Sequence, residues 1–193
     1  MIFRNNLVRS SLNNRVFGTF TTVSNILVDH NLFYNSATAQ SVFNNCQFLL
    51  VSNNVFINKD PAGSTAVSGI SNSTFTNNIT FGNTNPAPWT LFNNINGGGN
   101  IANQDPLIAA GTALLSSSAP DNPLLDYSIA SGPANNAGSD GKDMGLLYDN
   151  NTTANWNFAR NALLPYVRTL NITNPTVSPG GTLNVNITAI AAQ

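Results

Sequence analysis

The sequence has few charged residues, one cysteine and no long apolar run, and each shortage excludes a class of protein. Charged side chains make up 8% of the 193 residues, against about 25% in ordinary soluble domains. Seven basic and eight acidic residues give a net charge of -1, and without a basic patch we expect no nucleic-acid partner. No stretch approaches the roughly 18 apolar residues of a membrane-spanning helix. The single cysteine, Cys46, excludes an internal disulfide and is expected to be a buried thiol.

Asparagine takes the place of the missing charge. The chain contains 34 asparagines, with many Ser, Thr and Gly residues beside them. These side chains compete with the helix backbone for hydrogen bonds and favour turns. Apolar residues still make up 41% of the chain, which is enough for a buried core. The composition therefore predicts an all-β protein made of short strands and turns.

A repeat of about 24 residues runs through the first half of the chain. Its register marks are Asn6, Asn31, Asn54 and Asn78, at spacings of 25, 23 and 24 residues. Apolar columns lie three residues before each mark (Phe3, Val28, Val51, Phe75) and one residue after it (Leu7, Leu32, Val55, Ile79). Such short strands can bury their apolar faces only by stacking on successive copies of the repeat. We predict that the four asparagines form a ladder, in which each amide binds the next and satisfies buried polar groups.

The recurring Asn-Asn-apolar-Phe string resembles the right-handed parallel β-helix of pectate-lyase-like secreted bacterial proteins. The resemblance implies an all-β fold, with a right-handed solenoid of about four to five coils over residues 1–100. An antiparallel sandwich would give turn signals but no repeating register of identical residue types. The chain begins in the middle of the repeat, so we expect it to be the C-terminal portion of a longer natural protein.

The repeat register is lost after Gly97-Gly98-Gly99. The segment from Asp105-Pro106-Leu107 to Asp143-Met144-Gly145 resembles the closing segment of secreted β-helix proteins. We therefore expect a cap over residues 101–150 that covers the open end of the solenoid. Residues 151–193 are expected to form a linker and a β-hairpin tail with a turn at Pro179–Gly181, which resembles the first hairpin of an immunoglobulin-like module.

The acidic residues of the repeat region are few. The resemblance implies calcium held by clustered acids, or grouped carboxylates beside a histidine, yet the repeat contains only Asp29 and Asp60. The register places Arg4 one coil from Asp29, with Ser52 next, which favours an outward salt bridge over a catalytic remnant. Glycoside cleavage needs two carboxylates around the bond, and none joins Asp29. We therefore name no catalytic residue and expect a non-catalytic protein.

Four residues are the candidates for contact with a ligand: Arg4, Asp29, His30 and Tyr34. His30 is expected at the surface or in the ladder, because a single histidine cannot make a metal site. Tyr34 and Phe81 would form an outward strip for stacking on sugars, or would pack beneath loops.

Three acidic residues, Asp140, Asp143 and Asp149, gather near the cap. Oxygen ligands of this kind suit Ca²⁺, but the spacing is not that of a calcium loop. We favour turn-forming roles for them and expect no cofactor or metal.

These observations favour a non-catalytic extracellular module of a surface or adhesin-like protein, which contacts a polysaccharide or cell-surface glycan or serves as a structural stalk. One alternative is the C-terminal part of a polysaccharide lyase or hydrolase whose catalytic coils lie upstream. Another is a subunit of an extracellular fibre, self-associating through its uncapped first coil. In each case the location would be extracellular or at the cell surface.

Overall fold

The computed structural model describes residues 1–10, 15–22, 26–35, 41–66, 68–109, 111, 126–147, 166–172 and 185–190. The chain divides into two compact units, Met1–Trp156 and Asn157–Gln193.

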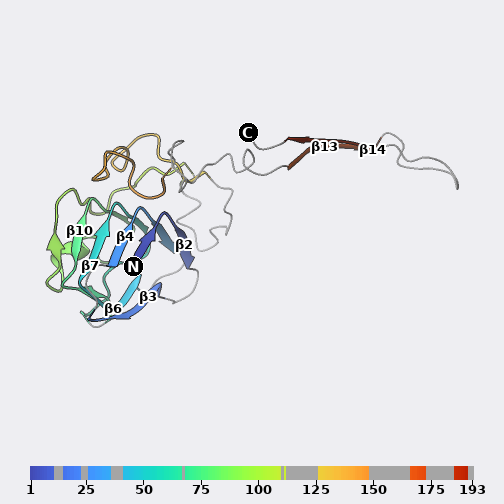
Figure 1. The fold of residues 1–193 in the computed structure, drawn as a ribbon. Coiled ribbons are helices and arrows are strands. Elements are labelled where there is room, and N and C mark those ends of the chain that lie inside the picture. The colour runs from blue at the N-terminus through green and yellow to red at the C-terminus, as the bar shows by residue number, and fades with distance from the viewer. Residues whose placement is uncertain are drawn as a thin grey trace. The chain divides into compact units, whose positions relative to one another are not determined.

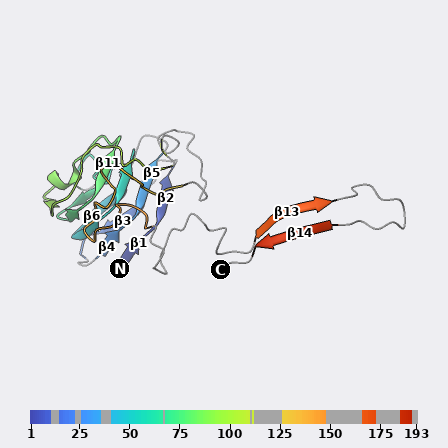
Figure 2. The ribbon, with the colours of Figure 1, turned by 90° about the horizontal axis from the view of Figure 1, so that it is seen from above.

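The first unit is a parallel β-solenoid, in which successive turns add strands to three sheets (Figures 1 and 2). The first sheet has the order β1-β4-β7-β10-β12, formed by Ile2–Arg4, Ile26–Asp29, Leu49–Ser52, Thr74–Thr76 and Ile95–Asn96. The second has the order β2-β5-β8-β11, formed by Leu7–Ser10, Leu32–Asn35, Val55–Ile57 and Ile79–Phe81. The third has the order β3-β6-β9, formed by Phe17–Phe20, Phe43–Gln47 and Ile70–Ser71.

All neighbouring strands in these three sheets pair in parallel. The solenoid makes about three turns that carry all three strands. The only helical element in the described residues is a short 3-10 turn, η1, at Pro88–Thr90. The predicted all-β class and the stacked parallel coils are therefore confirmed.

The register follows the sequence repeat. Phe3 pairs with Val28, Val28 with Val51 and Val51 with Phe75, across β1, β4, β7 and β10. The second predicted column pairs in the same way across β2, β5, β8 and β11. A repeat close to 24 residues thus returns the chain to the same position in each sheet.

The interior of the solenoid is a stack of phenylalanines between aliphatic columns. Phe33 and Phe56 lie with ring centroids 5.1 Å apart at an interplanar angle of 7°. Phe17 and Phe43 stack at 5.1 Å and 14°. Each such aromatic pair contributes about 0.5–1.5 kcal/mol beyond the area it buries. Coil spacing therefore brings like residues into contact inside the core.

A second apolar core lies on the outer face of the second sheet. Side chains alternate across a strand, so Phe33 points inward while its neighbours Leu32 and Tyr34 point outward. The outward residues pack against residues 126–147, which we call the strap. Its apolar members are Tyr127, Ile129, Ala134, Met144 and Leu146.

The strap differs from the expected end cap. Its described residues lie along the side of the coils rather than only over the last one (orange in Figure 1). The physical reason is the apolar outer face of β5, β8 and β11, which needs a cover of its own. Residues 112–125 and Asp149, which also belong to the predicted cap, lie outside the described residues.

In the second unit the backbone of β13, Tyr166–Ile172, pairs antiparallel with that of β14, Val185–Ile190. The register shifts between Val167 and Thr169. The predicted turn at residues 179–181 lies outside the described residues. The likeness to an immunoglobulin module therefore stays a prediction.

Candidate functional site

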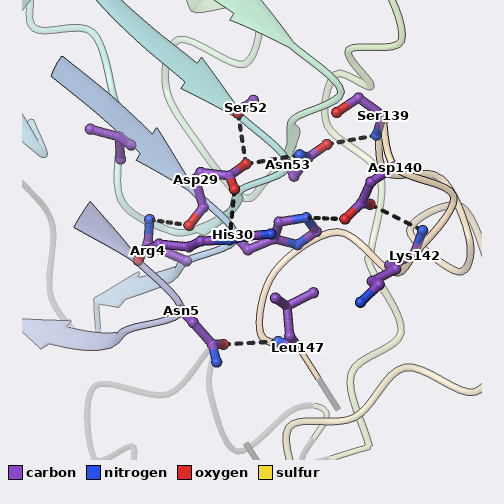
Figure 3. Close-up of polar contacts among 12 residues, drawn as sticks. Arg4, Asn5, Asp29, His30, Ser52, Asn53, Ser139, Asp140, Lys142 and Leu147 are labelled. Carbon is purple, nitrogen blue, oxygen red and sulfur yellow. Dashed lines mark hydrogen bonds and ion pairs between the residues drawn. The ribbon is translucent and has the colours of Figure 1, made fainter. Parts of the chain in front are cut away.

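A column of left-handed turn residues joins the first sheet to the second. Asn5, His30, Asn53 and Asn77 have φ values of 58°, 49°, 57° and 51°. Asparagine adopts this conformation more readily than most residues, which explains the first Asn of each Asn-Asn pair. His30 occupies the position that asparagine holds in the other coils. Figure 3 shows the polar contacts that this column makes with the strap.

The predicted neighbours Arg4 and Asp29 form an ion pair beside this column. Arg4 Nε lies 3.0 Å from Asp29 Oδ2, and the side chains are 46% and 9% exposed. Asp29 Oδ1 also accepts hydrogen bonds from Ser52 Oγ at 2.7 Å and from Asn53 Nδ2 at 2.8 Å. Hydrogen bonds to a charged group contribute about 1.5–3 kcal/mol each. Asp29 is therefore a satisfied, largely buried carboxylate, paired with Arg4 as the register predicted.

His30 lies beneath the strap with its side chain fully buried. Its Nδ1 lies 3.2 Å from the carbonyl oxygen of Gly145, and its Nε2 lies 3.2 Å from Asp140 Oδ2. The Nε2 contact has the distance of an ion pair without the alignment of a hydrogen bond. Lys142 N donates to the other carboxylate oxygen of Asp140 at 3.2 Å. Both ring nitrogens thus face oxygen atoms of the strap.

The asparagines of the turn column hold the strap at successive coils. Asn5 Oδ1 accepts a hydrogen bond from Leu147 N at 2.9 Å, and Asn53 Oδ1 accepts one from Ser139 N at 2.7 Å. Asn77 Nδ2 donates to the carbonyl oxygen of Ala137 at 2.8 Å. The strap therefore contacts four successive residues of the left-handed column, and later strap residues bind earlier members of that column.

Together these contacts form a fastening between the strap and the solenoid. Asp29 holds Asn53, and Asn53 in turn holds Ser139, so the ion pair orients a residue that binds the strap. A nucleophile or a proton donor needs an open face toward its substrate. Asp29 and His30 instead direct their polar atoms at protein groups.

One of the two alternatives for Tyr34 is supported, and neither expected place for His30 is correct. His30 lies neither at the surface nor in the asparagine ladder: the strap covers it, and the ladder in that coil uses Asn31. Tyr34 is only 1% exposed, with its ring centroid 6.4 Å from that of Tyr127, so it cannot stack on a sugar. Phe81 is half-buried against the same cluster. Packing beneath a loop is the reading that the structure supports for Tyr34.

The asparagine ladder is confirmed, and it contains one more rung than predicted. Asn31 Nδ2 donates to Asn54 Oδ1 at 2.9 Å, and Asn54 Nδ2 donates to Asn78 Oδ1 at 3.0 Å. Asn6 precedes them, and Asn100 follows Asn78 at 3.0 Å. Sequence reasoning missed Asn100 because three glycines break the pattern before it, although its spacing of 22 residues was the available signal.

The described residues contain no group of three or more His, Cys, Asp or Glu side chains placed to hold a metal ion. Asp143 Oδ1 accepts a hydrogen bond from Asn136 N at 2.8 Å, which is a turn-forming contact. Asp140 faces His30.

A polar hollow lies on the loops that connect the second and third sheets. Its volume is about 390 Å³, and its lining is Arg15, Ser41, Asp60, Ala62, Gly63, Ser64, Ser68, Thr84 and Asn85. Asp60 Oδ1 accepts a hydrogen bond from Asn85 N at 3.2 Å. Burial raises the pKa of the Asp60 carboxyl, while backbone hydrogen bonds from Asn85 and Thr84 lower it. Sequence reasoning noted Asp60 as an acid but not its surroundings.

Comparison with known proteins gives no relative from which a role could be transferred: no protein-family model, no curated protein and no solved structure matches this chain. Within the described residues no helix has the length and hydropathy to cross a bilayer.

Proposed function

We propose that this chain is a rigid, non-catalytic module of an extracellular or cell-surface protein and that it contacts a glycan. The observation that carries the proposal is the fastening: the Arg4–Asp29 pair of the repeat region, together with His30, ties the strap to the coils. A solenoid with a continuous amide ladder and a covered side face is a stiff scaffold, suited to presenting a surface or acting as a stalk.

The proposal also covers the handedness of the solenoid, its number of coils and the nature of the tail. We assign the solenoid a right-handed winding, because parallel crossovers within one sheet are right-handed in nearly all proteins. A pectate-lyase-like solenoid of about four to five coils, and a tail that begins an immunoglobulin-like module, agree with the repeat and with the antiparallel β13–β14 pair.

The hollow beside Asp60 supplies the glycan contact. Its carboxylate is held by the loop at Asn85 and keeps lone pairs for further donors. Ser41 is buried there, and its Oγ donates to the carbonyl oxygens of Phe43 and Ser68. The hollow is lined by carboxylate, guanidinium, amide and hydroxyl groups. Together they offer the hydrogen-bond donors and acceptors that bind the hydroxyl groups of a sugar.

The test is a glycan-array screen of the full chain together with a depolymerisation assay on polygalacturonate. We expect glycan binding without chain cleavage. Asp60→Asn, which keeps an acceptor oxygen, and Ser64→Phe, which fills the hollow from an exposed position, should each weaken binding at least about tenfold. Asp105→Asn is the matched control, because Asp105 is an exposed acid whose Oδ1 accepts a bond from Leu107 N.

Measurable cleavage of the polymer by this chain would overturn the non-catalytic role and favour a lyase or hydrolase. The absence of any bound glycan would overturn the glycan contact and leave the stalk role. Binding that survives both hollow variants would move the glycan site elsewhere.

A further inference from the structure

One residue of the left-handed column can change its charge near neutral pH. The other three positions hold Asn5, Asn53 and Asn77, whose amides bind the strap and do not titrate. His30 takes the fourth position and is the only histidine of the chain. An ordinary imidazole gains or loses a proton between about pH 5 and pH 8. The fastening of the strap therefore contains one contact that can respond to pH.

The ring of His30 faces an oxygen atom at each of its nitrogens. Nδ1 lies 3.2 Å from the carbonyl oxygen of Gly145, and Nε2 lies 3.2 Å from Asp140 Oδ2. A neutral imidazole has one N–H and one lone pair, so in either tautomer a lone pair points at an oxygen. An imidazolium carries an N–H on both nitrogens and can donate to both oxygens. The two contacts therefore match the protonated ring better than the neutral one.

Burial opposes the charged ring, and the carboxylate of Asp140 offsets this effect. The His30 side chain is fully buried, whereas the side chain of Asp140 is 34% exposed. The carboxylate can thus keep part of its hydration while it faces the ring, which lowers the cost of forming the ion pair. A neutral ring in the same place leaves a lone pair against a carbonyl or a carboxylate, with no water between them to relieve the repulsion.

The other charges near the ring have partners of their own. They come from the two sheet strands before the turn and from the strap: Arg4, Asp29, Lys142 and Asp143. Arg4 and Asp29 pair with each other. Asp143 accepts a hydrogen bond from Asn136 N, and the backbone N–H of Lys142 donates to Asp140. Asp140 is therefore the carboxylate that meets the imidazole (Figure 3).

We propose that the strap is fastened in a pH-dependent manner: protonated His30 holds it through Asp140 and Gly145, and loss of this proton as pH rises loosens it from the coils. Because the docked strap favours the protonated ring, proton binding and strap docking are linked. The fastening is strongest at pH values below the titration of the imidazole and is weakened as pH rises through it.

Loosening of the strap uncovers an apolar surface. Leu32, Val55 and Ile79 form the outer face of the second sheet and pack against the strap. Rising pH would therefore expose this face to solvent or to a partner. The inference goes beyond the glycan-contacting module, since it concerns the strap and not the hollow, and either can fail without the other.

The test is amide hydrogen exchange of the full chain, followed by nuclear magnetic resonance between about pH 5.5 and pH 8. Two amides report on the strap: Gly145 N donates to Asn53 O at 2.7 Å, and Leu147 N donates to Asn5 Oδ1 at 2.9 Å. Protection factors remove the intrinsic effect of pH on exchange. We expect them to fall at least about fivefold across this range, the low end of ordinary coupling between sites. Asn31 N, which donates to Asn54 Oδ1 inside the ladder, should keep its protection and shows that the coils stay folded.

Three variants separate the His30 contact from other effects of pH. His30→Asn places in this coil the residue that the column holds in the other three, and its strap protection should not change with pH. Asp140→Asn removes the carboxylate and should reduce the change to below about twofold. Asp143→Asn is the matched control, because it neutralises another acid of the strap and keeps the oxygen that accepts from Asn136 N. It should retain the wild-type pH dependence.

The signal of the single imidazole, followed in the same samples, should titrate over the range in which strap protection falls. Titration of this signal without any change in protection overturns the proposal. Protection that rises with pH also overturns it, because the neutral ring would then be the docked form. A pH dependence that persists in His30→Asn or in Asp140→Asn, or that disappears in Asp143→Asn, would show that other groups control the strap.

Discussion

Replacing an interior rung of the ladder should destabilise the solenoid far more than replacing its first rung. Asn54 is fully buried. Its Oδ1 accepts bonds from the N–H and the Nδ2 of Asn31, and its own Nδ2 donates to Val28 O, Ser52 O and Asn78 Oδ1. In Asn54→Ala the backbone N–H of Asn31 loses this acceptor inside the protein.

The size of the effect follows from these contacts. An orphaned buried N–H costs about 1–3 kcal/mol, and each further hydrogen bond lost costs about 1 kcal/mol. We expect Asn54→Ala to lower the free energy of unfolding by about 3–4 kcal/mol, a large part of the total for a domain of this kind. Asn6→Ala is the matched control. No described residue donates to Asn6 Oδ1, and its Nδ2 contacts are partly exposed, so its loss should cost about 1 kcal/mol or less.

The assay is urea unfolding followed by tryptophan fluorescence, with Trp89 buried at a ring-centroid distance of 6.3 Å from Phe75. At a slope of about 1–3 kcal/mol per molar urea, the midpoint of Asn54→Ala should fall by about 1–4 M. Equal losses in the two variants, or a loss below about 1 kcal/mol in Asn54→Ala, would refute the claim that the ladder satisfies buried backbone groups.

Three further predictions concern other parts of the first unit. Gly69→Ala should destabilise by about 2 kcal/mol or more, because a Cβ there would lie 2.1 Å from Gly63 N, whereas Gly18→Ala, with nothing within 4 Å, should be tolerated in the same urea assay. Burial of Cys46 raises the pKa of its thiol, so Ellman's reagent should label it only in urea; rapid labelling of the native protein would contradict this. Burial raises the pKa of Asp60 above 3.8, so its native state keeps a proton that the unfolded chain has lost. The protonated Asp60 carboxyl therefore contributes stability at pH values below its ordinary pKa. This contribution is lost as pH rises through the raised pKa of the native state. Between about pH 3 and pH 7, the unfolding free energy of Asp60→Asn should therefore rise relative to that of the wild type. A difference that does not change with pH would contradict a raised pKa for Asp60.

The parts of the fold that repeat were predictable from the sequence. The repeat length is nearly constant, and Asn recurs at one position of each repeat. Both signals can be read in the sequence, so Asn31, Asn54 and Asn78 could be aligned by counting alone. The same counting predicts Arg4 and Asp29 as neighbours on adjacent coils, and β1 and β4 pair in that register. The register of a solenoid is thus unusually accessible, because each coil is a copy of its neighbour.

The strap was not predictable in the same way. Its position depends on contacts such as Asn53 with Ser139 and Asn5 with Leu147, which join residues 86 and 142 positions apart. No periodic signal encodes such a contact. The burial of His30 and Tyr34 follows from the strap, so the sequence alone could not choose between a surface position and a covered one for Tyr34 or locate His30. The recurring Asn-Asn pairs were one available signal for the strap. The ladder uses only the second Asn of each pair, and the first Asn is the one that contacts the strap.

The central claim is that successive coils stack in parallel with their asparagines in line, and nuclear Overhauser contacts between backbone protons test it most directly. The structure predicts contacts that link Leu27 to Leu50 and Leu50 to Thr74, together with Asp29 to Ser52 and Ser52 to Thr76. In these pairs the sequence separation stays constant along each strand, as parallel pairing requires. Contacts in which one residue number rises as the other falls would mean antiparallel strands and would contradict the stacked coils.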